Sequence, residues 1–158
     1  MGFPSRFYFA FGSNMSPARV SERGLRFASL CGARLAGYAL RFNKMSADHA
    51  GSGHANIVSV ADGVVEGILY ELVSFSEICR MDPYERVPVN YSRLLVEVDV
   101  AGRQVEAWTY VANPAVRREG LVPEAAYMAH LLKGRPWLSS DYCARLETWP
   151  VIGSPGRG

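Results

Sequence analysis

The feature of this 158-residue sequence that most restricts its fold is a series of short strand-like segments joined by turns. These segments are rich in β-branched and aromatic residues, and several alternate apolar with polar positions, as half-buried strands do. Asp62-Gly63 is typical of a hairpin turn, and Ala101-Gly102 separates another pair of segments. The segments predicted as strands are 6–11, 28–35, 38–43, 54–60, 64–72, 91–100 and 105–112.

Helices are fewer than strands in this pattern. Ser16 is a suitable N-cap, and Pro17 suits the first position of the helix that follows it. Residues 74–81 carry a capping-box pattern, which predicts a short helix. The composition predicts two more helices, over 123–133 and 139–149. Antiparallel hairpins with few helices between them favour a curved, barrel-like sheet.

The length and composition favour one domain with a single core. Apolar residues make up 49% of the chain, which is enough for one hydrophobic core. We predict that residues 1–150 form this domain and that 151–158, which contains Gly and Pro, is a disordered tail. Residues 44–53 are rich in Ser, Gly, Asp and His and are predicted to form a surface loop.

Charge and cysteine content exclude several classes of protein. The formal net charge of +2 is close to neutral, so we expect no nucleic-acid partner. No segment approaches the roughly 20 apolar residues that cross a bilayer, and we expect no signal peptide and no membrane partner. The three cysteines are odd in number and form no CxxC pair, which suggests a reducing compartment and predicts a cytoplasmic protein. The sequence leaves the oligomeric state open.

The common catalytic and cofactor motifs do not occur. Neither glycine-rich phosphate-loop pattern is found, and the three histidines form no metal-ligand pair, so we expect no metal site. The cysteines lie in apolar segments and are predicted to be inert core thiols. A serine nucleophile would lack its usual G-x-S-x-G setting.

Two short segments remain as candidates for chemistry. Glu85 lies in a proline-bracketed loop, where Tyr84 and Tyr91 can supply apolar walls; partial burial would raise the pKa of its carboxyl toward the range of an acid–base catalyst. The alternative is that Glu85 is an ordinary charged residue on the surface. The turn 12–14 follows a strand and precedes a helix, so its backbone N–H groups suit an anion, with a plain turn as the alternative. Asp82, just before a proline, is more simply explained by turn geometry.

Three segments together resemble one known family. Residues 8–15 (YFAFGSNM) closely resemble the YFAYGSNL signature of the gamma-glutamyl cyclotransferase-like family, which includes gamma-glutamylcyclotransferase and gamma-glutamylamine cyclotransferase. Residues 81–85 (MDPYE) followed by 91–93 (YSR) resemble the second signature of that family, a leucine-Asp-x-x-Glu-Gly segment followed by Tyr-x-Arg. Residues 64–71 (VVEGILYE) are similar to its V-x-G-x-L-Y strand, so the resemblance runs from about residue 7 to residue 149.

The resemblance implies a fold, a reaction and a set of site residues. The expected fold is α+β: a small mixed, mostly antiparallel β-barrel with peripheral helices. Members of the family cleave a gamma-glutamyl amide by attack of the glutamyl group's own α-amine, which releases 5-oxoproline and a free amine or amino acid, without a metal or organic cofactor. The expected partner is therefore a small gamma-glutamyl substrate. The catalytic residue implied is Glu85, and the substrate-binding residues implied are Phe11, Gly12, Ser13, Asn14, Met15, Tyr91, Tyr110 and Tyr127.

The sequence departs from the family pattern at two positions. Phe11 replaces the tyrosine of the first signature, which removes a hydroxyl group, and Arg86 replaces the glycine that usually follows the catalytic glutamate. These departures keep two alternatives open, a non-catalytic ligand-binding domain and a hydrolase that releases glutamate. The substrate is also open among glutathione, gamma-glutamyl amino acids, gamma-glutamyl-lysine remnants and gamma-glutamyl-protected biosynthetic intermediates, as is whether the turn amides bind an oxyanion or the α-carboxylate.

Overall fold

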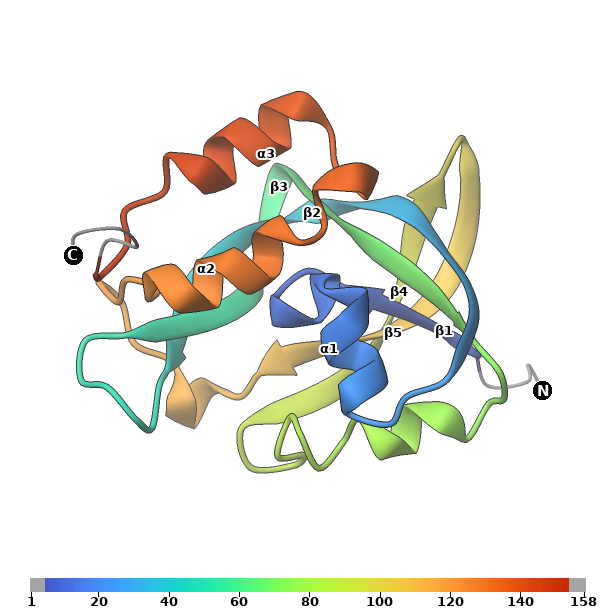
Figure 1. Ribbon diagram of the computed structural model, residues 1–158, viewed down its shortest axis with the longest axis horizontal. Helices are drawn as coiled ribbons and strands as arrows, with labels where there is room; N and C mark the ends of the chain where they lie inside the picture. Colours follow the sequence, from blue (N-terminus) through green and yellow to red (C-terminus); the bar gives the residue numbers. More distant parts are fainter. Residues whose placement is uncertain (1–4, 154–158) are drawn as a thin grey trace.

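The computed structural model describes residues 5–153 and is built around a closed five-stranded barrel (Figure 1). Neighbouring strands follow the order β1-β3-β2-β4-β5. The pairs along this order are antiparallel, and a parallel pairing between β1 and β5 closes the barrel. This confirms the predicted small, mixed but mostly antiparallel barrel. The strands are β1 (Phe7–Ala10), β2 (Phe27–Met45), β3 (Gly53–Leu72), β4 (Tyr91–Val100) and β5 (Arg103–Ala112).

The two longest strands correct the predicted boundaries. Segments 28–35 and 38–43 are parts of the single strand β2, and segments 54–60 and 64–72 are parts of β3. The predicted hairpin turn at Asp62-Gly63 is therefore wrong. The turn between β2 and β3 lies instead at residues 46–52, inside the segment predicted as a surface loop.

The Asp62-Gly63 segment is a bulge rather than a turn. Ala36 pairs with Val64, whereas Tyr38 pairs with Ser59, so residues 60–63 lie opposite a single position of β2. Extra residues on one strand bend and twist the sheet locally. The turn-like composition therefore marks a place where two long strands curve around the barrel.

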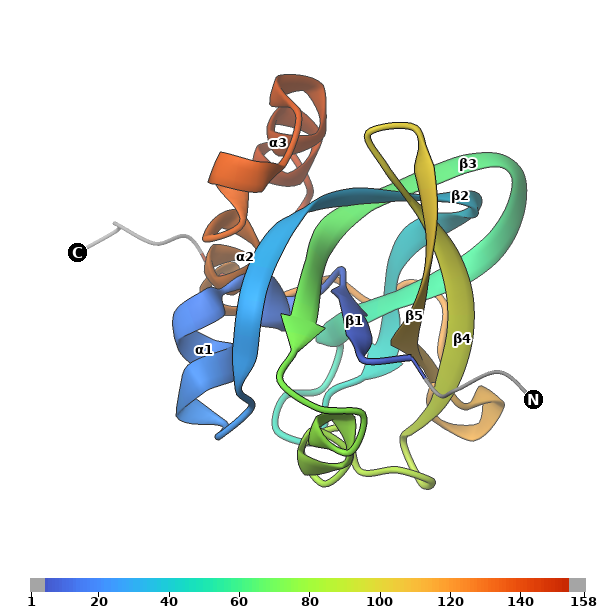
Figure 2. The same ribbon diagram turned by 90° about the vertical axis from the view of Figure 1, so that its right-hand side faces the viewer.

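The helices lie together on one side of the barrel, as Figure 2 shows. Ser16 caps α1 by accepting a hydrogen bond from the Arg19 amide, as its sequence position predicts. The predicted helix at 74–81 is reduced to the short 3-10 turn η2. The helices are α1 (Pro17–Glu22), α2 (Ala125–Leu132) and α3 (Ser140–Glu147), and the 3-10 turns are η1 (Ser13–Met15), η2 (Glu77–Arg80), η3 (Pro114–Val116) and η4 (Arg135–Trp137).

A continuous core fills the barrel and the space beneath the helices. Phe9 and Tyr70 of the barrel are fully buried, as are Val20 and Leu131 of the helices. Burying side chains of this size contributes about 1.5–3 kcal/mol each. The core therefore fixes α1 and α2 against the barrel strands from which the turn after β1 emerges.

Gly67 of β3 lies where the backbones of β1 and β3 approach each other closely. A Cβ atom at this position would lie 2.4 Å from the carbonyl oxygen of Ala10 and 2.6 Å from the Phe9 ring. Any side chain would therefore push β1 away from β3. Because β1 leads directly into η1, this contact also sets the position of the turn that follows.

The end of the described chain is held against α2. The Ile152 amide donates to the Pro123 carbonyl at 2.9 Å, and the Ala125 amide donates to the Ile152 carbonyl at 3.0 Å. The rest of the tail predicted as disordered, residues 154–158, lies outside the described residues. Among the helices of residues 5–153, none has the length and apolar character needed to cross a bilayer.

Candidate active site

A cavity of about 330 Å³ lies where the turn after β1, the loop 81–90 and the barrel strands meet. Its volume falls within the range of small-molecule sites. Both candidate segments of the sequence contribute to its wall: the turn supplies Gly12, Ser13 and Asn14, and the loop supplies Glu85. The fold therefore brings together two segments that lie about 70 positions apart in the chain.

The turn after β1 presents backbone N–H groups that have no protein partner. The Met15 and Ser16 amides are used inside the turn, where they donate to the carbonyl groups of Gly12 at 3.0 Å and Ser13 at 3.2 Å. Among the described residues, the amides of Ser13 and Asn14 donate to no acceptor. The first N–H groups of a helical turn are left unpaired in this way, and they suit an anion.

Met15 is the one predicted substrate-binding residue that does not reach the cavity. Its side chain is fully buried in the core, and its amide is already bonded to Gly12. The substrate-binding role expected for Met15 is therefore corrected to a structural one. Phe11 does line the cavity, but as a buried apolar wall without the hydroxyl group of the family signature.

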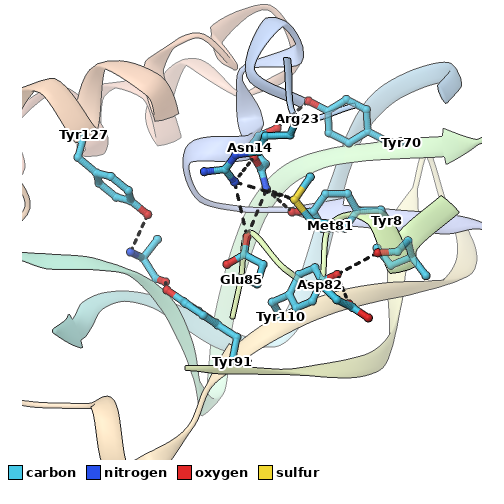
Figure 3. Close-up of polar contacts among 12 residues, drawn as sticks. Tyr8, Asn14, Arg23, Tyr70, Met81, Asp82, Glu85, Tyr91, Tyr110 and Tyr127 are labelled. Carbon is cyan, nitrogen blue, oxygen red and sulfur yellow. Dashed lines mark hydrogen bonds and ion pairs between the residues drawn. The ribbon is translucent and has the colours of Figure 1, made fainter. Parts of the chain in front are cut away.

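Asn14 is the centre of the polar network in the cavity (Figure 3). Its side-chain amide donates to the Tyr8 hydroxyl at 2.8 Å and to the Glu85 carboxylate at 3.3 Å. Its side-chain oxygen accepts from Arg23 at 3.0 Å, and its backbone carbonyl accepts from the Tyr70 hydroxyl at 2.7 Å. Four partners therefore fix the buried Asn14, which in turn fixes the orientation of Glu85.

The Glu85 carboxylate is largely withdrawn from solvent, with 17% of its side chain exposed. Burial raises the pKa of this carboxyl, and the cations of Arg23, Lys44 and Arg19 offset part of that rise. Arg23 is the nearest of them, with its guanidinium 4.0 Å from the carboxylate. A carboxyl with a raised pKa can both accept and return a proton near neutral pH, which is the property predicted for Glu85.

The loop that carries Glu85 is braced from the barrel. The amides of Tyr84 and Glu85 donate to the Met81 carbonyl, which forms a tight turn. The Asp82 carboxylate accepts from the Tyr110 hydroxyl at 2.7 Å and pairs with Arg93 at 3.1 Å. Asp82 is thus more than a turn residue, because its side chain ties the loop to β4 and β5 behind the cavity.

The three predicted pocket tyrosines come from three elements and meet at the cavity. Tyr91 on β4 donates its hydroxyl to the Ala55 carbonyl at 2.9 Å, and Tyr127 on α2 accepts from the Ala55 amide at 2.9 Å. Tyr110 on β5 lines the same wall. Burial raises the pKa of all three hydroxyl groups, that of Tyr127 to about 12, so they stay protonated and neutral.

The cavity also contains residues that the sequence did not reveal. His54 stacks on Tyr127 with the ring centres 4.5 Å apart, and burial together with the nearby Lys44 cation lowers the pKa of its imidazole to about 4. No motif marks these positions, because only the fold brings them to the cavity. The other polar residues missed are Arg19, Arg23, Lys44, Asp48, Asn90 and Thr109. Tyr8 lies in the first family signature but was not predicted as a site residue.

The cysteines do not take part in this site, and their predicted burial is wrong. Cys79 is exposed, and Cys31 and Cys143 are only partly buried. None of the three lines the cavity. Within residues 5–153, no cluster of three or more His, Cys, Asp or Glu side chains has an arrangement suited to a metal ion.

The barrel encloses a small cavity whose wall contains both the largely buried Glu85 carboxylate and the turn at residues 12–14. The chain belongs to the family described as gamma-glutamyl cyclotransferase, AIG2-like, which matches residues 8–129. This family membership supports activity of the gamma-glutamyl cyclotransferase type. No curated protein sequence matches the chain significantly.

Solved structures show the same fold. An uncharacterized human protein superposes with a TM-score of 0.82 at 23% identity, covering 98% of this chain and 94% of the other. A structure named gamma-glutamyl cyclotransferase superposes with a TM-score of 0.80 at 23% identity, covering 96% and 91%. A yeast gamma-glutamyl cyclotransferase specific to glutathione gives 0.63 at 15% identity, covering 89% and 93%. At such identities the likeness is one of fold.

Proposed function

We propose that this protein is a gamma-glutamyl cyclotransferase, which converts a gamma-glutamyl amide into 5-oxoproline and a free amine. One observation carries the proposal: the Glu85 carboxylate lies 3.3 Å from the side chain of Asn14, in the same turn whose Ser13 and Asn14 amides are unpaired. A proton acceptor and an anion-binding group thus share one small cavity. The reaction requires this pair of groups.

The first step is a proton transfer to Glu85. The α-amine of the substrate arrives as an ammonium group and must lose one proton before it can attack. The pKa of Glu85, raised by burial, makes its carboxylate a better proton acceptor than an ordinary exposed glutamate. The nearby Arg23 lowers the pKa of Glu85 and so favours the ionised carboxylate that must accept this proton.

Ring closure follows within the substrate. The freed α-amine attacks the γ-carbonyl carbon and forms the fifth bond of the ring, while the carbonyl electrons move onto oxygen. The unpaired turn amides can hold this oxyanion or the α-carboxylate of the substrate. When the oxyanion collapses, the C–N bond to the leaving group breaks, and Glu85 returns its proton to the leaving amine. The ring nitrogen, which still carries two protons, gives up the second one through Glu85, so the lactam forms and the leaving group departs as an ammonium ion.

The walls of the cavity favour the folded substrate. Tyr91 and Tyr127 are fixed by their bonds to Ala55, and a Cβ atom added at Gly12 would lie 3.3 Å from the Tyr127 hydroxyl. Gly12 therefore lets the turn pack closely against Ala55 and Tyr127. Holding both ends of a flexible glutamyl chain can supply on the order of several kcal/mol of the barrier.

Product analysis tests this proposal. We expect the purified protein to convert at least one member of a panel of gamma-glutamyl amides to equal amounts of 5-oxoproline and amine, measured by mass spectrometry. Glu85→Gln removes the proton acceptor and keeps the shape of the side chain, so turnover falls by about 100-fold or more. The matched control is Glu97→Gln, an exposed glutamate on β4, which keeps wild-type turnover.

Three results would contradict the proposal. Release of glutamate instead of 5-oxoproline would indicate attack by water and a hydrolase. Binding of gamma-glutamyl compounds without any product would indicate a ligand-binding domain. Near wild-type turnover by a folded Glu85→Gln variant would remove Glu85 from the chemistry.

A further inference from the structure

The charges that line the cavity do not balance. Four cationic side chains, Arg19, Arg23, Lys44 and Arg86, line it, and only two carboxylates, Glu85 and Asp48, do so. His54 adds no charge at neutral pH, because its pKa is lowered to about 4. The lining therefore carries two positive charges in excess, four minus two. Asp48 is itself exposed, so water already screens much of its charge.

Three of these cations, Arg19, Lys44 and Arg86, have no carboxylate partner among the described residues, and the Nε of Arg19 is buried without a hydrogen-bond partner. Lys44 and Arg86 lie near enough to each other for their like charges to interact. Arg23 is already engaged with Asn14 and Glu85. In contrast, no carboxylate within residues 5–153 comes within 4.0 Å of Lys44 or Arg86. Lys44 is also only 6% exposed. A largely buried ammonium group without a counterion is unfavourable unless a ligand supplies one.

Arg86 occupies a backbone position that suits glycine. Its φ angle of 50° lies in the left-handed region, which a residue with a side chain rarely adopts. Glycine is the residue expected here from the family pattern. The side chain is exposed while it also lines the cavity, so the arginine lies at the rim. Unfavourable backbone conformations of this kind are characteristic of functional sites.

We propose that Lys44 and Arg86 select gamma-glutamyl compounds whose leaving amine carries an anionic group, a carboxylate or a phosphate. The glutamyl half of the substrate cannot balance these cations, because its α-ammonium and α-carboxylate cancel each other. The compensating charge must therefore come from the other half of the substrate. This inference rests on the proposed function and specifies its substrate class.

Three matched substrates test the selection. Gamma-glutamyl-alanine carries a carboxylate on the leaving half, gamma-glutamyl-alaninamide has the same shape without the charge, and gamma-glutamyl-(1-aminoethyl)phosphonate carries a phosphonate in its place. We expect kcat/KM to be about 10- to 100-fold higher for the better of the two anionic substrates than for the amide. Whichever anionic substrate is the better one shows whether a carboxylate or a phosphate group is preferred.

Variants assign the selection to the two cations. In Arg86→Gly, and more strongly in Lys44→Met/Arg86→Gly, the ratio of kcat/KM between the anionic and neutral substrates falls toward one. Arg103→Gln removes one positive charge from the exposed first residue of β5, which does not line the cavity, and keeps the wild-type ratio. A double variant that folds and retains the full ratio would overturn the inference, as would equal kcat/KM values for all three substrates in the wild type.

A binding measurement separates this inference from the proposed reaction. Titration calorimetry with Glu85→Gln compares the affinities of the same three compounds without turnover. Tighter binding of the anionic compounds supports charge selection even if no 5-oxoproline forms, a result that would contradict only the proposed reaction. Production of 5-oxoproline with equal affinities and equal kcat/KM values would contradict only the charge selection.

Discussion

Two groups of charged residues in the cavity wall differ in whether they have partners within the protein. Beside the turn, the side chains of Glu85, Asn14 and Arg23 form a connected network of hydrogen bonds and an ion pair. A second group, Lys44 and Arg86, lines the same cavity without a carboxylate within 4.0 Å among the described residues. The difference separates two tasks: groups fixed before the substrate arrives suit catalysis, and charges left uncompensated suit selection of a ligand.

The largest effect is expected from breaking the network at Asn14. Asn14→Ala removes the contacts that hold Glu85 and Tyr8, so kcat falls by about 10- to 100-fold while KM changes less, because the proton acceptor is misplaced. Steady-state kinetics with the preferred substrate measures this. Gln104→Ala, an exposed amide on β5, is the matched control. A kcat within about two-fold of the wild type would show that Asn14 does not position the base.

The second effect concerns the charge of Arg23, which acts on the pKa of Glu85. Arg23 is the strongest of the cations that lower the pKa of Glu85. Arg23→Gln therefore raises this pKa further, and because Glu85 must be ionised to accept a proton, the acid limb of kcat/KM moves to higher pH. The pH profiles of wild type, Arg23→Gln and the control Arg103→Gln measure the shift. An unchanged or acid-shifted limb in Arg23→Gln would contradict the assignment of Glu85 as the base.

The third effect concerns stability. It tests whether burial and the Lys44 cation keep the neighbouring His54 neutral. His54 has a pKa of about 4 in the folded protein against 6.5 ordinarily. The unfolded chain binds a proton more readily between these values, so the contribution of His54 is complete above about pH 6.5 and is lost as pH falls through 4. Its size is on the order of 2 kcal/mol.

His54→Gln should remove this part of the pH dependence of the free energy of unfolding. Urea unfolding at several pH values between 4 and 7 measures it. His49→Gln is the control, because the His49 side chain is 66% exposed. If His54→Gln and the wild type lose stability equally on acidification, then His54 is not held neutral in the cavity.

The smallest effect is expected from removing the unfavourable backbone conformation at Arg86. Arg86→Gly removes a left-handed arginine, and we expect the free energy of unfolding to rise by about 1 kcal/mol, measured by chemical denaturation. Ala101→Gly is a matched control, since Ala101 is also left-handed, with φ 49°, but lies outside the cavity. Both variants gain stability, and only Arg86→Gly changes substrate preference. A loss of stability in Arg86→Gly alone would show that its side chain serves the fold.

The start of α1, which has a local sequence signal, was predicted correctly, whereas the lengths of the two longest strands were not. Ser16 and Pro17 marked the start of α1 correctly, because capping depends on neighbouring residues. Asp62-Gly63 misled, because the same residues suit a hairpin turn and a bulge, and only the pairing of β2 with β3 distinguishes these. Strand ends set by long-range pairing cannot be derived from local composition.

The residues proposed for catalysis could be predicted from the sequence, and those proposed for substrate selection could not. Glu85 and the turn 12–14 lie in family signatures, so the resemblance identified them before their spatial contact was known. Lys44 reaches the cavity from the far end of β2, and Arg19 from α1, and neither position carries a motif. Met15 is the last residue of the first signature, but its side chain is buried in the core. This orientation depends on how η1 packs, which the signature does not reveal.

Strand β1 closes the barrel and also leads directly into the turn at residues 12–14, which we propose binds the substrate. It pairs in parallel with β5 through Tyr8 and Trp108, and the Thr109 hydroxyl donates to the Phe9 carbonyl at 2.9 Å. A ligand seated on the turn therefore also resists separation of the seam between β1 and β5. Substrate binding should therefore slow amide hydrogen exchange along the pairing of β1 with β5 more than elsewhere in the sheet. The bound substrate would then stabilise the closure of the barrel.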